Sequence, residues 1–193
     1  RRHDCDVLLD QNFYEDMYTR YVNKVPAHCQ LFLGPRYALL REEFRQLREQ
    51  IMPRTGVVKR VLVFFGGIDA DNYTAQAIEA LANIRKRDLY VDVVIGAEHP
   101  YREQVESACA DHDFMCHVQT NRMAELMASA DLAVGAGGSA SWERCSLGLP
   151  ALVFPMANNQ RRLVEEAALR GLLYTPLSQS GIAPPIEFHL KAL

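Results

Sequence analysis

Short apolar runs alternate with amphipathic stretches over residues 57–175, and no other feature constrains the fold as strongly. The runs have the length of buried strands, and the stretches between them repeat apolar residues at helical spacing. Strands separated by helices pair in parallel through right-handed crossovers and are covered on both faces. The sequence therefore predicts a doubly wound, Rossmann-like α/β domain with a parallel sheet. Strands are expected at 61–65, 89–96, 114–118, 131–137 and 150–155, and helices at 72–87, 101–112, 122–130, 139–148 and 159–171.

Residues 1–56 do not continue this alternation. They contain strand-like pieces within 5–12 and 29–33 and a charged helix at 41–50. Two strands do not form a stable sheet alone, so we expect 1–56 to be the end of an amino-terminal Rossmann-like domain plus an interdomain segment. The tail, 176–193, contains two adjacent prolines and is expected to be a loose end or a docking segment. The apolar stripe of the charged helix consists of Phe44, Leu47 and Ile51.

Composition narrows the classes of function. The formal net charge of −3 does not favour a polyanionic partner such as DNA. The amino terminus lacks the apolar core of a signal peptide, and no apolar run approaches the ~20 residues of a membrane span. The five cysteines are odd in number and include no CxxC pair, which indicates reduced thiols rather than disulfides or a zinc site. We therefore expect a cytoplasmic protein with no membrane span, no nucleic-acid partner and no metal.

The stretch GAGGSASWERCSLGLP, which begins at Gly135, predicts an anion site. Its glycines lack a Cβ, so the backbone can approach a ligand closely. Successive amides in such a turn, together with the amino end of the helix that follows, form a concavity that binds phosphate. Gly137, Gly138 and Ser139 are the expected contacts, and Ser139 can either cap the helix or donate its hydroxyl to the ligand. A plain strand-to-helix turn is the alternative.

The same turn formally fits the dinucleotide pattern G-x-G-x-x-[GA]. That fingerprint belongs to a first βαβ unit and needs an acid about 20 residues later for the ribose. Here the turn follows the fourth expected strand of the domain, and the strand ending at Phe154 is followed by Pro-Met-Ala-Asn-Asn without an acid. No Gly-Lys-Ser/Thr follows the glycines either. The sequence thus predicts neither an NAD site nor an ATPase P-loop.

Glu143 lies about one helical turn after the glycines. A capping box counted from Ser139 would place the acid at Trp142, so Glu143 misses that pattern by one residue. Its alternative role is weak complementation of the helix dipole, ~0.3–1 kcal/mol. A carboxylate also accepts hydrogen bonds from vicinal hydroxyls. We therefore expect a nucleoside diphosphate, with the diphosphate at the glycines and the ribose at Glu143.

Two more strand ends carry candidate residues. In FFGGID, Asp69 and Asp71 are expected to cap the next helix. Because their charges would repel phosphate, Gly67 of this loop is expected to line the nucleotide cleft rather than to bind phosphate. The alternative is a plain strand-to-helix turn. Asn159 and Gln160 open the fifth helix of the domain. Their amides can bond the hydroxyl or acetamido groups of a sugar. The alternative is an Asn cap on an ordinary first turn.

Taken together, VLVFFGGID, ADLAVGAGGSASWERCSLGLP and NNQ resemble the carboxyl-terminal half of GT-B glycosyltransferase-like proteins. More closely, they resemble the PseG family, the UDP-2,4-diacetamido-2,4,6-trideoxy-β-L-altropyranose hydrolases of pseudaminic acid biosynthesis. CDVLLDQN and LFLGPRYALLREEF resemble the end of that family's amino-terminal half. The resemblance covers nearly all of the chain up to about Gly171. It implies two Rossmann-like domains, with UDP on the carboxyl-terminal domain and the amino-terminal domain facing the sugar.

The resemblance also implies a reaction. Members hydrolyse the anomeric C–O bond of the nucleotide sugar without a metal or another cofactor and release UDP and 2,4-diacetamido-2,4,6-trideoxy-L-altrose. The family's catalytic histidine lies in a Gly-x-Gly-His loop that this chain lacks, and His3 does not match it, so the catalytic residue is unknown. We expect the 193-residue chain to bind UDP weakly and to be inactive alone. The implied UDP contacts are Gly137, Gly138, Ser139 and Glu143, and the implied sugar contacts are Asn159 and Gln160.

Two other classes of function remain open from the sequence. A GT-B sugar transferase of the lipid-intermediate type uses the same nucleotide half and differs in the surface that binds its acceptor. A non-catalytic nucleotide-binding or regulatory module is the other alternative.

Overall fold

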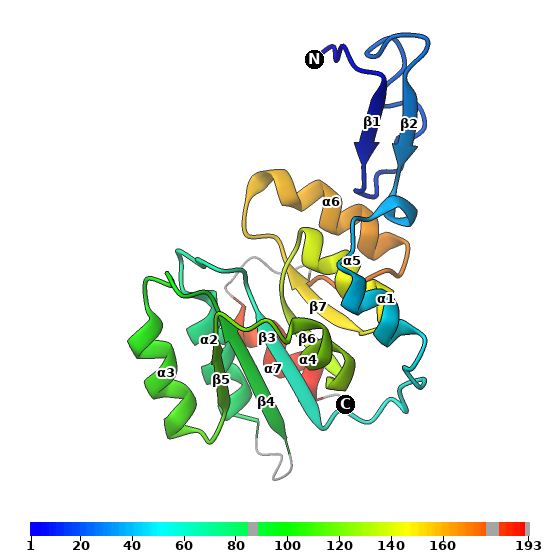
Figure 1. The fold of residues 1–193 in the computed structure, drawn as a ribbon. Helices are drawn as coiled ribbons and strands as arrows, with labels where there is room; N and C mark the ends of the chain where they lie inside the picture. Colours follow the sequence, from blue (N-terminus) through cyan, green and yellow to red (C-terminus); the bar gives the residue numbers. More distant parts are fainter. Residues whose placement is uncertain (85–88, 177–181, 192–193) are drawn as a thin grey trace.

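The computed structural model describes residues 1–84, 89–176 and 182–191. Its centre is a parallel five-stranded sheet in the order β5-β4-β3-β6-β7 (Figure 1). All five expected strands are present, and helices cover both faces, so the predicted doubly wound α/β fold is confirmed. The strands are β3 (Arg60–Phe64), β4 (Tyr90–Ile95), β5 (Met115–Val118), β6 (Leu132–Ala136) and β7 (Ala151–Phe154).

The direction in which strands are added reverses between β3 and β6. From β3 the chain proceeds outward to β4 and β5, then returns to pair β6 against the other side of β3. In this pairing Phe64, the last residue of β3, lies opposite Gly135. Open parallel sheets bind ligands beyond the carboxyl ends of their strands at such a switch point. The topology therefore brings the Gly66–Gly67 loop and the Gly135–Gly138 turn to the same edge.

Side chains on alternating positions of the strands divide the core into two layers. Val61 and Val63 face α2 and α3, whereas Leu62 faces α4 and α5. The expected helices are confirmed, although each ends earlier than predicted and the last of them begins one residue before its predicted start. The end of the first predicted range, 85–87, lies outside the described residues. The helices are α2 (Tyr73–Ala82), α3 (Arg102–Asp111), α4 (Met123–Ser129), α5 (Ser139–Ser146) and α6 (Asn158–Leu169).

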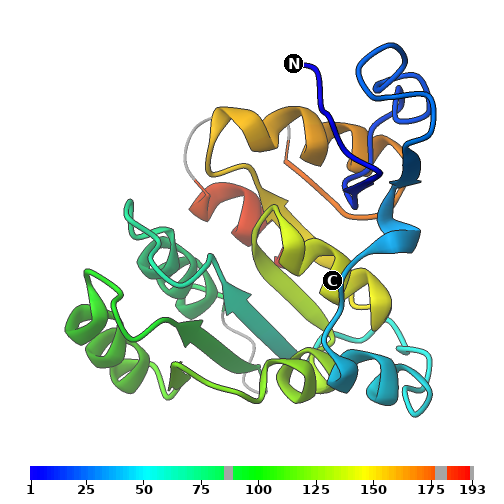
Figure 2. The same ribbon diagram turned by 45° about the horizontal axis from the view of Figure 1, so that its top comes forward.

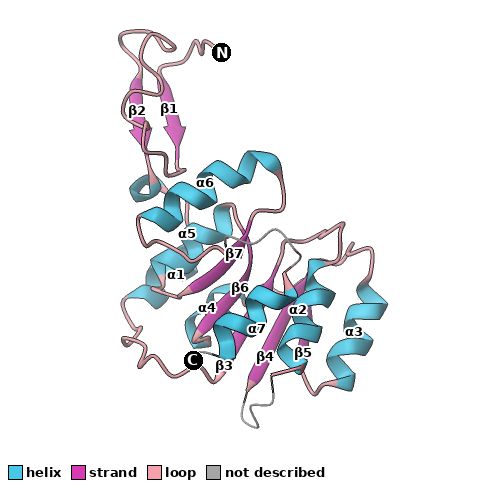
Figure 3. Cartoon of the chain, turned by 180° about the vertical axis from the view of Figure 1, so that it is seen from behind, coloured by secondary structure: helices cyan, strands magenta, loops and turns pink. Residues whose placement is uncertain are grey.

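The tail contains a further helix, α7 (Ala183–Lys191). It packs beside α2 on the layer seen from behind in Figure 3, and Ile182 and Ile186 are buried in the core there. Pro184 and Pro185 fall in its first turn, where the missing backbone N–H groups have no helical partner to lose. Of the two expectations for the tail, the docking segment is therefore confirmed for α7, and the prolines that suggested a loose end lie within a helix start. Residues 177–181 of the predicted tail lie outside the described residues.

A two-stranded parallel sheet near the amino terminus stands apart from the main sheet (Figure 1). Its strands are β1 (Val7–Asp10) and β2 (Gln30–Leu33), and the 3-10 helix η1 (Pro35–Tyr37) follows. Val7, Leu9 and Leu31 are exposed on these strands. Both strand-like pieces expected before residue 34 are thus strands, and they pair with each other in parallel.

The charged helix expected at 41–50 is α1 (Glu42–Arg48), and it packs on the main domain. Figure 2 shows it beside α4. Phe44 is fully buried among α4 and α5 residues, with Leu47 and Ile51 packed against the same cluster. Beyond α1, the Arg54 guanidinium donates to carbonyl oxygens at the carboxyl ends of α4 and α5, including those of Ala130 (2.8 Å) and Leu147 (2.7 Å). The connection to the sheet is therefore held firmly against two helices.

Replacing Phe44 with Ala should destabilise the protein by ~3–5 kcal/mol, because the ring is fully buried and its removal leaves a cavity under α1. Urea unfolding of the purified chain measures the change. Leu39→Ala is the matched control: this side chain precedes the same helix and is 78% exposed, so a change within ~0.5 kcal/mol is expected. Equal losses in the two variants would contradict the packing of α1 described above.

Candidate functional site

The glycines of the turn after β6 have different surroundings. A Cβ on Gly135 would lie 2.0 Å from the Phe64 carbonyl oxygen, and one on Gly137 would lie 2.6 Å from Val164 Cγ2. Strand pairing thus requires glycine at position 135, and helix packing requires glycine at position 137. Gly138 has φ +124° and open space where a Cβ would stand. Of the three, Gly138 alone has open space at its Cβ position, so packing within the protein does not account for the glycine there.

Three backbone N–H groups at this turn are available to bind an anion. Gly138 is the N-cap of α5, and no side chain caps the helix. Among the described residues, the N–H groups of Gly138, Ser139 and Ala140 have no acceptor, whereas Ser141 N donates to Gly138 O at 3.0 Å. Unpaired amides and the positive end of the helix dipole favour a phosphate here. Ser139 is the first residue of α5 rather than its cap, and it is exposed, so its hydroxyl is accessible to a ligand.

Arg144 lies directly beneath the turn, and the sequence reasoning assigned it no role. Its Nη2 donates to Ala136 O at 2.7 Å and to Ser141 Oγ at 3.1 Å, and the residue is 2% exposed. Burial lowers the pKa of Arg144 to about 10, so the guanidinium is protonated at neutral pH. The sequence holds no local signal for this role, because the spacing of Ser141 and Arg144 places them on one face of α5 but does not show that this face is turned inward.

Glu143 lies beside Arg41 of the amino-terminal segment. Its side chain is 20% exposed, and its Oε1 lies 3.7 Å from the Nη2 of Arg41. Burial raises the pKa of Glu143 above its ordinary value of 4.5, although Arg41 and Arg144 act in the opposite direction. The side chain is thus partly exposed about one turn along α5 from the free amides.

The loop after β3 faces the turn after β6. Gly67 is exposed, with open space where a Cβ would stand, and its carbonyl accepts from Gly96 N at 3.2 Å. Asp69 accepts from two amides in the first turn of α2, at 3.0 and 2.7 Å, so its expected capping role is confirmed. Asp71 was expected to share that role, but Asn72 is the N-cap instead. A left-handed φ of 52° aligns the Asn72 side chain with the helix end.

The start of α6 meets the glycine turn. Ala157 is its N-cap, so Asn159 does not cap the helix, and its side chain is exposed in the first turn. Gln160 Oε1 accepts from Met156 N at 3.0 Å and lies 3.6 Å from the Cβ position of Gly137. The Gln160 oxygen therefore shapes the loop, and its NH2 group remains the part able to reach a sugar. The structure thus brings the turn, Gly67, Asn159 and Gln160 to the carboxyl edge of the sheet.

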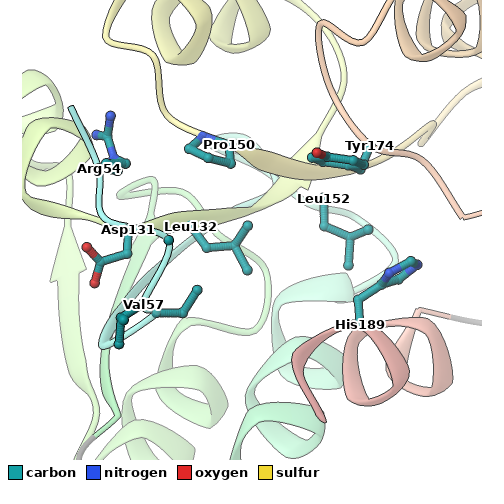
Figure 4. Close-up of a pocket in the computed structure, with 10 residues that line it drawn as sticks. Arg54, Val57, Asp131, Leu132, Pro150, Leu152, Tyr174 and His189 are labelled. Atoms are coloured by element: carbon teal, nitrogen blue, oxygen red, sulfur yellow. The ribbon is translucent and has the colours of Figure 1, made fainter. Parts of the chain in front are cut away.

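A separate cavity of about 480 Å³ lies at the opposite edge (Figure 4). Val58, Leu132 and Pro150 line it at or just before the starts of their strands, and Tyr174 and His189 close one side. It is therefore distinct from the predicted nucleotide site. Among the described residues, no helix is long and apolar enough to cross a membrane.

Solved structures show the class of fold. The chain superposes on MurG of Acinetobacter baumannii with a TM-score of 0.61 at 14% identity, over 96% of this chain and 57% of that one. It superposes on the spinosyn rhamnosyltransferase SpnG, solved with thymidine diphosphate, with a TM-score of 0.57 at 17% identity, over 72% of this chain and 37% of that one. The chain thus has the fold of one part of these GT-B glycosyltransferase-like proteins.

Comparison with protein families assigns the chain to a narrower class than the fold does. Residues 60–186 match the Glycosyltransferase family 28 C-terminal domain, and the chain belongs to that family. It is 28% identical over 160 residues to the spore coat polysaccharide biosynthesis protein SpsG of Bacillus subtilis, which covers 82% of this chain and 46% of SpsG. It is also 28% identical over 141 residues to an uncharacterized protein of Methanocaldococcus jannaschii, covering 70% of this chain and 29% of that protein. The chain thus spans less than half the length of these curated relatives.

Replacing Gly135 with Ala should destabilise the fold by ~1–3 kcal/mol, because the new Cβ meets a backbone oxygen of β3 that cannot move without disturbing the sheet. Chemical denaturation measures the loss. Gly67→Ala is the matched control, since its Cβ meets open space, and its effect should stay within ~0.5 kcal/mol. Similar stabilities for the two variants would contradict the close pairing of β3 and β6 at this point.

Proposed function

We propose that this chain is the nucleotide-binding half of an enzyme that processes a UDP-sugar. One observation carries the proposal: three unpaired amides at Gly138–Ala140 stand at the switch point of the sheet, with the accessible carboxylate of Glu143 one turn along the same helix. The amides suit a diphosphate, and the carboxylate suits a ribose. Membership of the family 28 glycosyltransferases supports a nucleotide-sugar substrate.

The proposed pose runs along the carboxyl edge of the sheet. The diphosphate contacts the amides of Gly138 and Ser139, with Gly137 and Gly67 lining the cleft around it. The sugar extends toward Asn159 and the NH2 group of Gln160 at the start of α6. Uridine is the proposed base on the resemblance described above. A cytoplasmic setting belongs to the same proposal, because free thiols persist in reducing compartments and all five cysteines are free.

The proposed reaction is hydrolysis of the anomeric C–O bond in a PseG-type UDP-sugar. Water attacks the anomeric carbon, its proton passes to a base, and the C–O bond to the diphosphate breaks with the electron pair leaving on UDP. The free amides stabilise the charge that develops on this leaving group. No residue of this chain is assigned as the base. We propose that the base lies on an amino-terminal domain, and that β1 and β2 belong to the sheet of that domain. The chain alone is proposed to bind UDP weakly and to be inactive.

Transfer of the sugar to an acceptor is the second candidate, favoured by the family to which the chain belongs. The complete protein, expressed from its full reading frame, should release free sugar from its UDP-sugar in water at the rate of UDP release when no acceptor is added. Chromatography of the products measures both rates. Slow release that accelerates only when an acceptor is added would overturn the hydrolase proposal in favour of transfer.

Glu143→Gln should weaken UDP binding about tenfold, because hydrogen bonds to a charged acceptor exceed those to a neutral amide by ~1.4 kcal/mol. The ionised carboxylate accepts one hydroxyl proton on each of its two oxygens, whereas the Gln side chain has a single acceptor oxygen. Since burial raises the pKa of Glu143 above 4.5, wild-type affinity should fall as the pH drops toward that raised value, and the variant should lose this component. Calorimetric titration with UDP at several pH values measures both effects.

Glu165→Gln provides the control for that experiment, because this acid is exposed on α6 and lies outside the proposed site. Its affinity and pH profile should match the wild type. If Glu143→Gln also matched the wild type at every pH, the ribose would not lie at Glu143.

A further inference from the structure

The core of the main domain contains a charge that has no ion-pair partner among the described residues. Arg144 is 2% exposed, and among the described residues no carboxylate forms an ion pair with it. Its Nη2 bonds two neutral oxygens, those of Ala136 and Ser141, and its buried Nε has no partner. The neighbouring Glu143 carboxylate is paired instead with Arg41, at 3.7 Å. A protonated guanidinium is thus hydrogen-bonded to neutral acceptors alone, and the Glu143 carboxylate acts on it without forming an ion pair.

Such an arrangement is unfavourable unless something else offsets it. A charge removed from water loses several kcal/mol of solvation, and neutral hydrogen bonds recover only part of this loss. Arginine loses its proton far less readily than lysine, so the group does not escape the penalty by becoming neutral. A buried cation that persists without a protein counterion is therefore suited to an anion that arrives from outside.

The position of the charge identifies where that anion binds. The guanidinium reaches back along α5 to the Ala136 carbonyl, immediately before the glycine turn. Its Nη1 lies 3.1 Å from the Cβ position of Gly135, where a side chain would displace it. The turn whose amides are unpaired at Gly138–Ala140 begins directly above this group. Because the guanidinium is itself shielded from water, its positive charge acts on a ligand above the turn more strongly than an exposed charge would.

We propose that Arg144 is a positioning residue for the diphosphate of the nucleotide, acting through the turn rather than by direct contact. Its bond to Ala136 O holds that carbonyl inward, so that the amides that follow face the ligand, and its charge is the counterion that the bound diphosphate balances. This inference rests on the proposed function and adds a requirement to it: selectivity for nucleoside diphosphates over uncharged nucleosides depends on a residue that the ligand does not touch.

The forked geometry explains why arginine occupies this position. One nitrogen reaches both the Ala136 carbonyl and the Ser141 hydroxyl while a second extends under Gly135. A lysine ammonium is a compact point charge that does not reproduce this planar fork. Arg144→Lys therefore retains the charge and loses the geometry, whereas Arg144→Met removes both and keeps much of the volume.

Calorimetric titration of the wild type, Arg144→Lys and Arg144→Met with UDP and with uridine tests the inference. Arg144→Met should weaken UDP binding at least about tenfold and uridine binding less than about twofold, so the ratio of the two affinities collapses. Arg144→Lys should fall between the wild type and Arg144→Met. An unchanged ratio, with both ligands weakened equally or not at all, assigns Arg144 a structural role and overturns the inference.

A second variant keeps the test decisive if Arg144→Met does not fold. Ser141→Ala removes one hydroxyl that holds the guanidinium and leaves the charge in place, and it should lower the UDP-to-uridine affinity ratio about two- to threefold. A ratio equal to that of the wild type contradicts the positioning role. If the wild type itself fails to bind UDP, the proposed function fails; if the wild type binds UDP and the variants retain its selectivity, the Arg144 inference alone fails.

Discussion

Parallel pairing of β3 with β6 is the constraint on which the rest of the structure depends. It sets Phe64 against Gly135 at the switch point of the sheet, so two glycine loops from distant parts of the sequence end at one edge. The approach is so close that a methyl group at Gly135 would overlap the neighbouring strand. The proposed ligand site lies along this edge, because α5 and α6 begin there with their amino ends directed across it.

The site combines a part of the turn that is fixed by packing with backbone amides that remain free. Strand pairing fixes Gly135, packing against Val164 fixes Gly137, and Arg144 fixes the carbonyl between them. The amides from Gly138 onward then remain free of protein acceptors. Preorganised donors of this kind lose little free energy when charge develops on a ligand, because they need not reorient. The geometry therefore suits departure of a diphosphate as well as its binding.

The sequence predicted the layered sheet well because each strand and helix has a distinct apolar period. It predicted α7 poorly, since Pro184 and Pro185 are typical of loops unless they happen to occupy a first helical turn. Within the site, the glycine turn was evident from its composition. The different duties of Gly135 and Gly138 depend on which atoms lie opposite them, and no local pattern encodes that.

The burial of Arg144 likewise could not be predicted from the local sequence. An arginine beside a glutamate on a short helix is typical of an exposed polar face, and only the tertiary structure reveals that one is buried and the other accessible. The N-cap of α6 was missed for a related reason. Asn159 has the side chain of a cap, but the chain enters the helix two residues earlier, at Ala157.

The contacts of Arg54 have a mechanical consequence. Because its guanidinium ties the connection before β3 to the carboxyl ends of α4 and α5, and Phe44 anchors α1 on the same helices, the stretch from α1 to β3 moves as one body with the large sheet. The segment between β1 and β2 is tied to the same domain, because Glu15 N donates to Glu166 Oε2 at 2.8 Å and Asp16 forms an ion pair with Arg162 at 3.1 Å, both on α6. The small amino-terminal sheet is therefore joined to the main domain at two places, one through this segment and one through Gly34–Arg41, and it cannot swivel about either connection alone.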